Sequence, residues 1–263
     1  MGLFTNYSKE GPGVEKDTPR KTGIGRFFEL VGRDMNGMFM ANFLACIGFI
    51  PVICLVYVGF LMRSLLVMLV SAAIGGIVAG PVLAGMYDTV LRALRDAPGS
   101  WRHNYARALR QNWRGALVPG ALTGLFLAAG AFAGMMLFGW AAVWPSLGTV
   151  CVYLFSWLLF FALQVLYWPQ LVLFEQKNSV RLRNALLFTL KYSLPVLGAA
   201  GLQLAAWLLM VLFAPWTLLL LPVAAVWFIP YAALFVLYDD WEEAFHLEEQ
   251  IAAQFPDQPV RRD

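Results

Sequence analysis

Charged residues are scarce in this chain, and the longest gaps between them are wide. Residues 115–174 contain no Asp, Glu, Lys or Arg, and a second such gap lies between Lys191 and Asp239. Only 13% of all residues are charged, whereas a soluble globular domain carries about a quarter. So few charges cannot cover a soluble domain, while about 20 apolar residues suffice for one helix to cross a bilayer. The sequence therefore predicts a membrane protein.

Cysteines and catalytic motifs are also scarce. Cys46, Cys54 and Cys151 all lie within apolar runs, which argues against a disulfide framework. The chain has no Gly-x-x-x-x-Gly-Lys-Ser/Thr loop, no His-Glu-x-x-His and no Gly-x-Ser-x-Gly. Its two histidines, His103 and His246, stand far apart, so neither makes a convincing metal site. We expect no enzymatic activity, cofactor or metal, and the net charge of +3 is too small to indicate nucleic acid binding.

The apolar runs fit six helices. Proline-containing turns at residues 144–148 and 214–216 divide the two longest runs. The predicted fold class is an all-α membrane protein whose six transmembrane helices form three helical hairpins. The predicted spans are residues 38–61, 65–87, 116–139, 146–174, 193–213 and 216–238. They belong to one transmembrane domain, residues 22–238, between a flexible N-terminal tail, residues 1–21, and an acidic C-terminal tail, residues 239–263.

Lysine and arginine are distributed asymmetrically along the chain. Arg63 stands alone in the first tight turn, and the turns near Pro145 and Pro215 carry no charge. The other eighteen lie in the N-terminal segment, residues 88–114, residues 175–191 and the C-terminal tail. Because positively charged connections stay in the cytoplasm, we expect a multi-pass protein of the cell membrane with both termini cytoplasmic.

Two of the predicted cytoplasmic connections resemble each other. Residues 100–113 and 179–192 have Ser, Ala and aromatic residues at equal offsets, and each reads as an amphipathic helix that precedes a hairpin. An apolar stripe at helical spacing over residues 24–38 suggests a more divergent third copy. We hypothesise three related hairpins with amphipathic interfacial helices on the cytoplasmic face.

Arginines in these connections are the candidate binding residues. Positions 103, 107, 110 and 114 share one helical face, and such a face suits anionic lipid headgroups or an acidic partner. Membrane topology alone would also place positive charges here. The candidates are Arg92, Arg95, Arg102, Arg107, Arg110, Arg114, Arg181 and Arg183.

The polar residues inside the predicted spans are few. Gln164, Gln170 and Gln203 are explained by hydrogen bonds between helices, with contact to a solute as the alternative. No charged residue lies in the interior of a span, which counts against an ion-coupled transporter. Small residues recur four apart in three pairs that would let helices approach closely: Gly76 with Gly80, Gly120 with Gly124, and Gly130 with Gly134.

Carboxylates gather at the predicted cytoplasmic side. Asp88, Glu175 and Asp239 lie where returning helices reach water, and pairing with neighbouring arginines is their simplest role. The acidic tail also places Trp241 and Phe245, and likewise Ile251 and Phe255, four residues apart. A short amphipathic helix could therefore fold back on the basic connections or dock elsewhere.

One family resemblance emerges from the first connection. The segments 80–96 (Gly-Pro-Val-Leu-Ala-Gly-Met-Tyr through Leu-Arg-Ala-Leu-Arg-Asp) and 101–114 (Trp through Asn-Trp-Arg) are similar to the YesL-like family of small bacterial integral membrane proteins. Residues 7–14 and 26–29 resemble the longer members of this family.

The resemblance implies association with bacterial carbohydrate ABC importers. The expected function is an accessory subunit that binds the permease subunits of an oligosaccharide importer, and through them an ATPase and a solute-binding protein. The lipid bilayer would be its other partner. Two alternatives remain open from the residues: a stand-alone transporter or channel for small solutes, and a membrane-bound regulator or scaffold.

Overall fold

The structure, a computed structural model that describes residues 21–97 and 99–254, consists in these ranges of helices joined by turns and loops, without a strand. Most of the predicted N-terminal tail and the pair Ile251 and Phe255 thus lie outside the described side chains. The α-helices are α1 (Gly23–Leu61), α2 (Leu65–Leu94), α3 (Trp101–Gly134), α4 (Leu147–Leu173), α5 (Asn178–Lys191), α6 (Ser193–Leu212), α7 (Val226–Val236), α8 (Tyr238–Phe245) and α9 (Leu247–Gln254). Three short irregular helices are η1 (Met135–Gly139), η2 (Trp216–Leu219) and η3 (Leu221–Ala225).

Five of these helices are long and apolar enough to cross a membrane. They match the first five predicted spans, the fourth and fifth to within one residue at each end and the third with η1 counted as part of α3. A sixth span is added if Leu221–Val236 and Tyr238–Phe245, bent by 60° at their junction, count as one. Large apolar side chains point outward along the bundle, as Ile53, Leu66 and Val211 do with exposed fractions of 64%, 74% and 72%. A surface of this kind fits a hydrocarbon solvent, so the expectation of a multi-pass membrane protein is supported.

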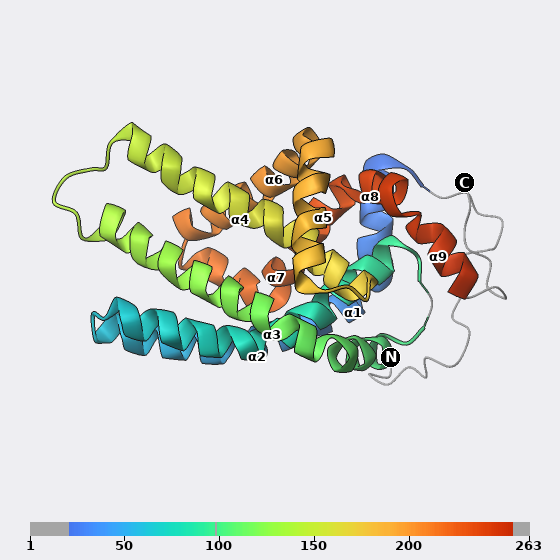
Figure 1. The fold of residues 1–263 in the computed structure, drawn as a ribbon, viewed down its shortest axis with the longest axis horizontal. Helices are drawn as coiled ribbons and strands as arrows, with labels where there is room; N and C mark the ends of the chain where they lie inside the picture. The colour runs from blue at the N-terminus through green and yellow to red at the C-terminus, as the bar shows by residue number, and fades with distance from the viewer. Residues whose placement is uncertain (1–20, 98, 255–263) are drawn as a thin grey trace.

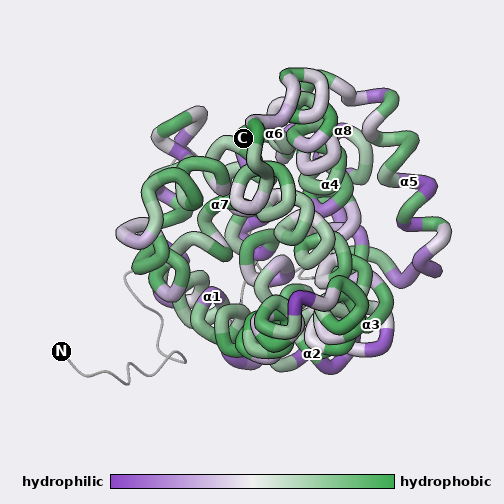
Figure 2. The backbone as a smooth tube through the Cα atoms, turned by 90° about the vertical axis from the view of Figure 1, so that its left-hand side faces the viewer, coloured by the Kyte–Doolittle hydropathy of each residue, from purple (hydrophilic) through white to green (hydrophobic). Residues whose placement is uncertain are grey.

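The bundle has two chemically different ends (Figure 1). At one end lie the turn at Arg63 and the connections between α3 and α4 and between α6 and α7; we call it the turn end. The other end gathers residues 88–107, 174–183 and 238–250, and we call it the charged end. Seen from the turn end, the backbone of the bundle is predominantly hydrophobic (Figure 2).

The predicted interfacial helices are only partly separate. Helices α1 and α3 run without interruption from their amphipathic beginnings into the predicted spans. Two of the three predicted interfacial helices are therefore not separate from the spans that follow them. The interfacial helix α5 is separate from α6, because the backbone of Tyr192 between them (φ −113°, ψ 44°) leaves the helical region. Helix α5 consequently lies across the long axis of the bundle (Figures 1 and 2). The three predicted copies are therefore not built alike at this end.

The closest helix contact joins α2 and α3. A methyl group added to Gly76 or Gly80 would collide with the backbone of α3, and one added to Gly120 or Gly124 would collide with the backbone of α2. The two predicted glycine pairs therefore face each other, and their missing side chains let the two backbones touch. By contrast, Gly130 and Gly134 leave room for the Trp157 and Tyr153 side chains of α4, which fill a wider gap.

The predicted sixth span, residues 216–238, is wrong as one regular helix. It consists of the 3₁₀ helix η2, the π-helical turn η3 and α7. Pro222 has no N–H to donate, so it interrupts regular helical hydrogen bonding at this point of the chain. The side chain of Asn42 in α1 bonds to the backbone of this segment: its Nδ2 donates to the Leu221 and Pro222 carbonyls at 2.8 and 2.9 Å, and its Oδ1 accepts from the Val226 and Trp227 amides at 3.0 and 3.1 Å.

Alanine at Gly120 should destabilise the protein, because its methyl group would separate α2 from α3. We expect Gly120→Ala to lower the free energy of unfolding by about 1–3 kcal/mol. The control is Gly198→Ala in α6, where the added methyl meets nothing within 4 Å, so stability should be unchanged or slightly raised. Denaturation of both variants in the same detergent, followed by circular dichroism, measures the difference. Equal stabilities would contradict the α2–α3 contact.

Removing the amide of the fully buried Asn42 should also destabilise the protein. Asn42→Ala removes four hydrogen bonds to backbone groups of residues 221–227, at a cost of about 1–3 kcal/mol. Amide hydrogen exchange at Val226 and Trp227 should become faster in this variant. Cys54→Ala, at an exposed position of the same helix, serves as the control and should exchange like the parent protein.

Candidate functional site

A polar cavity of about 770 Å³ lies at the charged end. The end of α2, the beginning of α3, the end of α4 and the beginning of α5 surround it, and Gln250 of α9 contributes from the C-terminal side. Its volume falls within the usual range of sites for small ligands.

Positive charge exceeds negative charge in this cavity. Five cationic side chains line it, Arg92, Arg95, Arg107, Lys177 and Arg181, against the two carboxylates Asp88 and Glu175. One carboxylate is already engaged, since Asp88 Oδ2 accepts from Arg92 Nε at 2.9 Å. The Nη1 group of Arg92 is nevertheless buried without a hydrogen-bond partner.

Arg181 is a buried cation of the cavity that is held by two hydrogen bonds. It is 6% exposed, and it donates from Nη1 to Asn178 Oδ1 at 2.8 Å and from Nη2 to the Phe174 carbonyl at 3.2 Å. Both bonds hold the guanidinium at the α4–α5 connection. Its Nε group is buried and has no partner, which leaves one directional donor of a charged group unsatisfied.

The buried positive charge of Arg95 is only partly balanced by its surroundings in the cavity. Its side chain follows the last turn of α2, it is 7% exposed, and its Nε donates to the Leu91 carbonyl at 3.2 Å. Burial lowers the pKa of the Arg95 guanidinium to about 10, and the nearby Asp88 carboxylate offsets only part of that effect. The group stays charged at neutral pH, so its cost of burial favours any anion that approaches it.

The N-terminus of α5 opens onto the same cavity. Lys177 is its N-cap residue and provides no side-chain cap, and the first turn contains no acidic residue. The unpaired N–H groups and the dipole of a helix N-terminus attract anions. Backbone and side chains thus present positive charge to one space.

The eight predicted arginines separate into two groups. Arg92, Arg95, Arg107 and Arg181 line the cavity. The others, Arg102, Arg110, Arg114 and Arg183, are exposed outside it. His103, Arg107 and Arg110 border a smaller depression of about 340 Å³, in keeping with their predicted common helical face. Arg114 instead lies over the Trp113 ring, 5.2 Å from its centre.

Several lining residues were not singled out from the sequence. They are Gln111, Asn112, Gln176, Lys177, Asn178 and Gln250. Nothing in the sequence distinguishes these polar residues from those of any solvated loop. Only the positions of α3, α5 and α9 around one cavity bring them together.

The three intramembrane glutamines do not form one polar path. Gln164 of α4 donates to Thr123 Oγ1 of α3 at 3.2 Å and accepts from Trp168 Nε1. Gln203 of α6 donates to the Phe161 carbonyl of α4 at 3.5 Å, and Gln170 bonds only within α4, to the Leu166 carbonyl at 3.1 Å. Two of them thus join neighbouring helices, as expected for polar residues in a bilayer.

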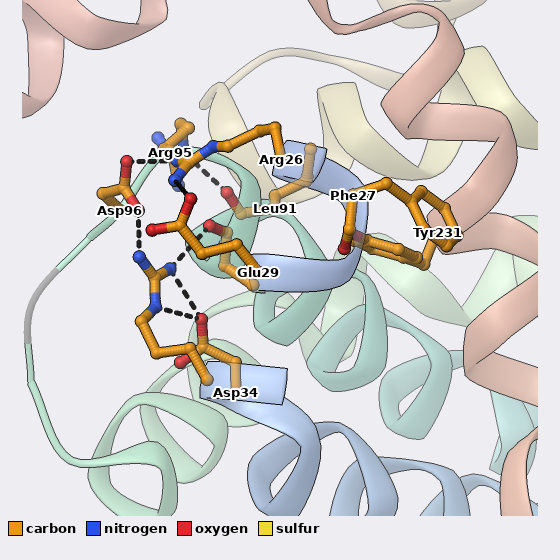
Figure 3. A network of polar contacts seen from close by, with 10 residues as sticks. Arg26, Phe27, Glu29, Asp34, Leu91, Arg95, Asp96 and Tyr231 are labelled. Atoms are coloured by element: carbon orange, nitrogen blue, oxygen red, sulfur yellow. Dashed lines mark hydrogen bonds and ion pairs between the residues drawn. The ribbon is translucent and has the colours of Figure 1, made fainter. Parts of the chain in front are cut away.

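A second polar cluster joins the beginning of α1 to the end of α2 (Figure 3). The Asp96 carboxylate pairs with both Arg26 and Arg33. Arg33 also donates to the Ala93 carbonyl at 3.0 Å, and Arg26 lies 3.6 Å from Glu29. Asp96 sits in a left-handed turn (φ 52°) directly after α2, so the turn places its carboxylate against α1.

The acidic C-terminal segment folds back on its own chain, one of the two outcomes anticipated. The contact is chiefly aromatic: the Trp241 and Phe245 rings of α8 lie 5.2 and 6.1 Å from the Phe188 ring of α5. The ion pair between Lys191 and Glu243, at 3.4 Å, is exposed on both sides and contributes little. Burial of Trp241, which is 2% exposed, therefore holds this segment near the cavity.

Metal binding finds no support among residues 21–97 and 99–254. In these ranges no group of three His, Cys, Asp or Glu side chains lies close enough to hold an ion. His103 and His246 belong to different helical elements and share no such group.

Comparison with known proteins gives no relative: no family model matches the chain, and no curated protein or solved structure matches it. The similarity to the YesL-like family therefore stays a prediction from the residues of the first connection.

Replacing Asp96 by asparagine should loosen the beginning of α1. The substitution keeps the shape and tolerates the left-handed backbone, but it leaves the largely buried Arg26 without its nearest carboxylate. We expect a loss of roughly 3 kcal/mol in the free energy of unfolding and faster hydrogen exchange over residues 23–37. Asp34→Asn removes the more exposed partner of Arg33 and should cost less than about 1 kcal/mol. Equal effects of the two substitutions would contradict the central place of Asp96.

Proposed function

We propose that this protein is a non-catalytic accessory subunit of a larger membrane assembly. The resemblance of segments 80–96 and 101–114 to the YesL-like family suggests a bacterial carbohydrate ABC importer as that assembly. In this proposal the helices contact the permease subunits within the cell membrane, while the ATPase and the solute-binding protein of the importer supply energy and substrate capture.

The closed packing of the polar residues inside the bundle carries this proposal. The α2 and α3 backbones touch at their glycines, and the amide groups of Asn42, Gln164 and Gln203 bond within or between neighbouring helices. A solute path needs polar groups free to replace water along one axis. Because these three amides are already engaged with the protein, and the unpartnered Oε1 of Gln170 is buried in α4, an accessory role fits better than a stand-alone transporter or channel.

The outward surface supports association inside the membrane. Helix α5 carries a row of exposed leucines, Leu182, Leu186 and Leu190, along one side. Their spacing of four residues forms a continuous apolar stripe next to the charged end. Such a stripe can lie in lipid or against the apolar face of another subunit.

Isolation from native membranes tests this proposal. The tagged chain, extracted in a mild detergent, should retain two permease subunits and an ATPase in fixed ratio, as identified by mass spectrometry. An equally tagged, unrelated multi-pass protein from the same membranes is the control and should retain none of them.

Recovery of the chain alone, or only with copies of itself, in several mild detergents would contradict the accessory role. Solute flux into liposomes that contain the purified protein would then test the transporter alternative.

A further inference from the structure

We propose that the cavity at the charged end is a binding site for a phosphate group, carried either by an anionic phospholipid or by a small soluble phosphate ester. This inference concerns the cavity alone and does not depend on the accessory role.

The charge of the cavity determines the sign of its ligand. Its five cationic side chains face two carboxylates, and Asp88 is occupied by Arg92. The remaining positive charge is held partly away from water, where electrostatic attraction is stronger than at an open surface. A cationic or neutral ligand would leave this charge uncompensated, so the site favours an anion.

Unsatisfied donors determine the geometry of the ligand. The Nε of Arg181 and the Nη1 of Arg92 are buried without partners, and both side chains line the cavity. Arg181 is more than nine-tenths buried and is oriented by its bonds to Asn178 and Phe174. Guanidinium groups arranged in this way match the several acceptor oxygens of a phosphate.

The N-terminus of α5 adds backbone donors to the same space. Lys177 and Asn178 begin this 14-residue helix and line the cavity beside Arg181. A helix N-terminus with neighbouring arginines forms a common phosphate site in proteins.

The position and size of the cavity leave room for more than phosphate. Its volume of about 770 Å³ exceeds the needs of one inorganic anion, and the amides of Gln111, Asn112 and Gln176 also line it. Amides can donate to and accept from hydroxyl groups. A phosphate ester with a hydroxylated substituent, such as the glycerol headgroup of phosphatidylglycerol, therefore fits the lining.

Two binding measurements distinguish the source of the phosphate. In neutral detergent, glycerol 3-phosphate is titrated against the purified full-length chain, and thermal unfolding reports binding. In phosphatidylcholine nanodiscs, association of spin-labelled phosphatidylglycerol is measured with and without an excess of glycerol 3-phosphate. If glycerol 3-phosphate stabilises the protein in detergent and also displaces the spin-labelled lipid in nanodiscs, the ligand is a soluble ester. If the lipid associates and glycerol 3-phosphate does not displace it, the ligand is a phospholipid.

Variants connect the binding to this cavity. Arg181→Gln should weaken the affinity by roughly tenfold, since it removes a buried charged donor, and Lys177→Gln should weaken it by about threefold. The matched control Arg183→Gln removes the same charge from an exposed position of α5 outside the cavity and should change affinity less than about twofold. Lys177 is exposed, so its substitution remains informative even if Arg181→Gln does not fold.

The proposal would be overturned by either of two results. One is the absence of binding to both the ester and the lipid by the parent protein. The other is an equal loss of affinity in Lys177→Gln and Arg183→Gln, which would indicate attraction to the general positive charge of this end instead of a site in the cavity.

Discussion

The contact between the glycines of α2 and α3 fixes the rest of the bundle. These two helices meet backbone to backbone where Gly76 and Gly80 face Gly120 and Gly124. Because α2 ends with Arg92 and Arg95 and α3 brings Arg107 to the same end, a close contact in the middle of the helices also determines how these charges converge. The positions of the arginines at the charged end thus depend on the packing of α2 against α3 inside the bundle.

The bilayer imposes the second condition, since polar groups in hydrocarbon need partners from the protein. Asn42 provides hydrogen-bond partners for the irregular segment around Pro222, and Gln164 and Gln203 form hydrogen bonds between helices. Buried polar atoms without partners occur in both regions: Gln170 Oε1 and Trp227 Nε1 lie within the predicted spans, and Arg92 Nη1 and Arg181 Nε lie at the charged end. At the charged end these atoms belong to guanidinium groups that line one cavity, and this gathering of charge locates the site.

The long helices could be predicted from the sequence, because a membrane span needs a stretch without charged residues that is long enough to cross the hydrocarbon core. It also identified the glycine pairs and the arginines, but it could not tell that two of the glycine pairs meet or that four of the eight arginines share a cavity, since these are tertiary relations. Pro119 lies inside the continuous α3, while Pro195 follows the break before α6. The two similar connections thus lead into different local structures, and Asn42 had no local signal at all.

The distribution of lysine and arginine predicts that the cavity opens on the cytoplasmic side of the membrane and that the turn end lies outside. Single cysteines at Gln111, which lines the cavity, and at Trp144, an exposed residue of the turn end, test this prediction in a chain whose Cys46, Cys54 and Cys151 are replaced. A membrane-impermeant maleimide added to intact cells should label position 144 at once and position 111 only after permeabilisation. Labelling of position 111 in intact cells, with position 144 protected, would contradict the account.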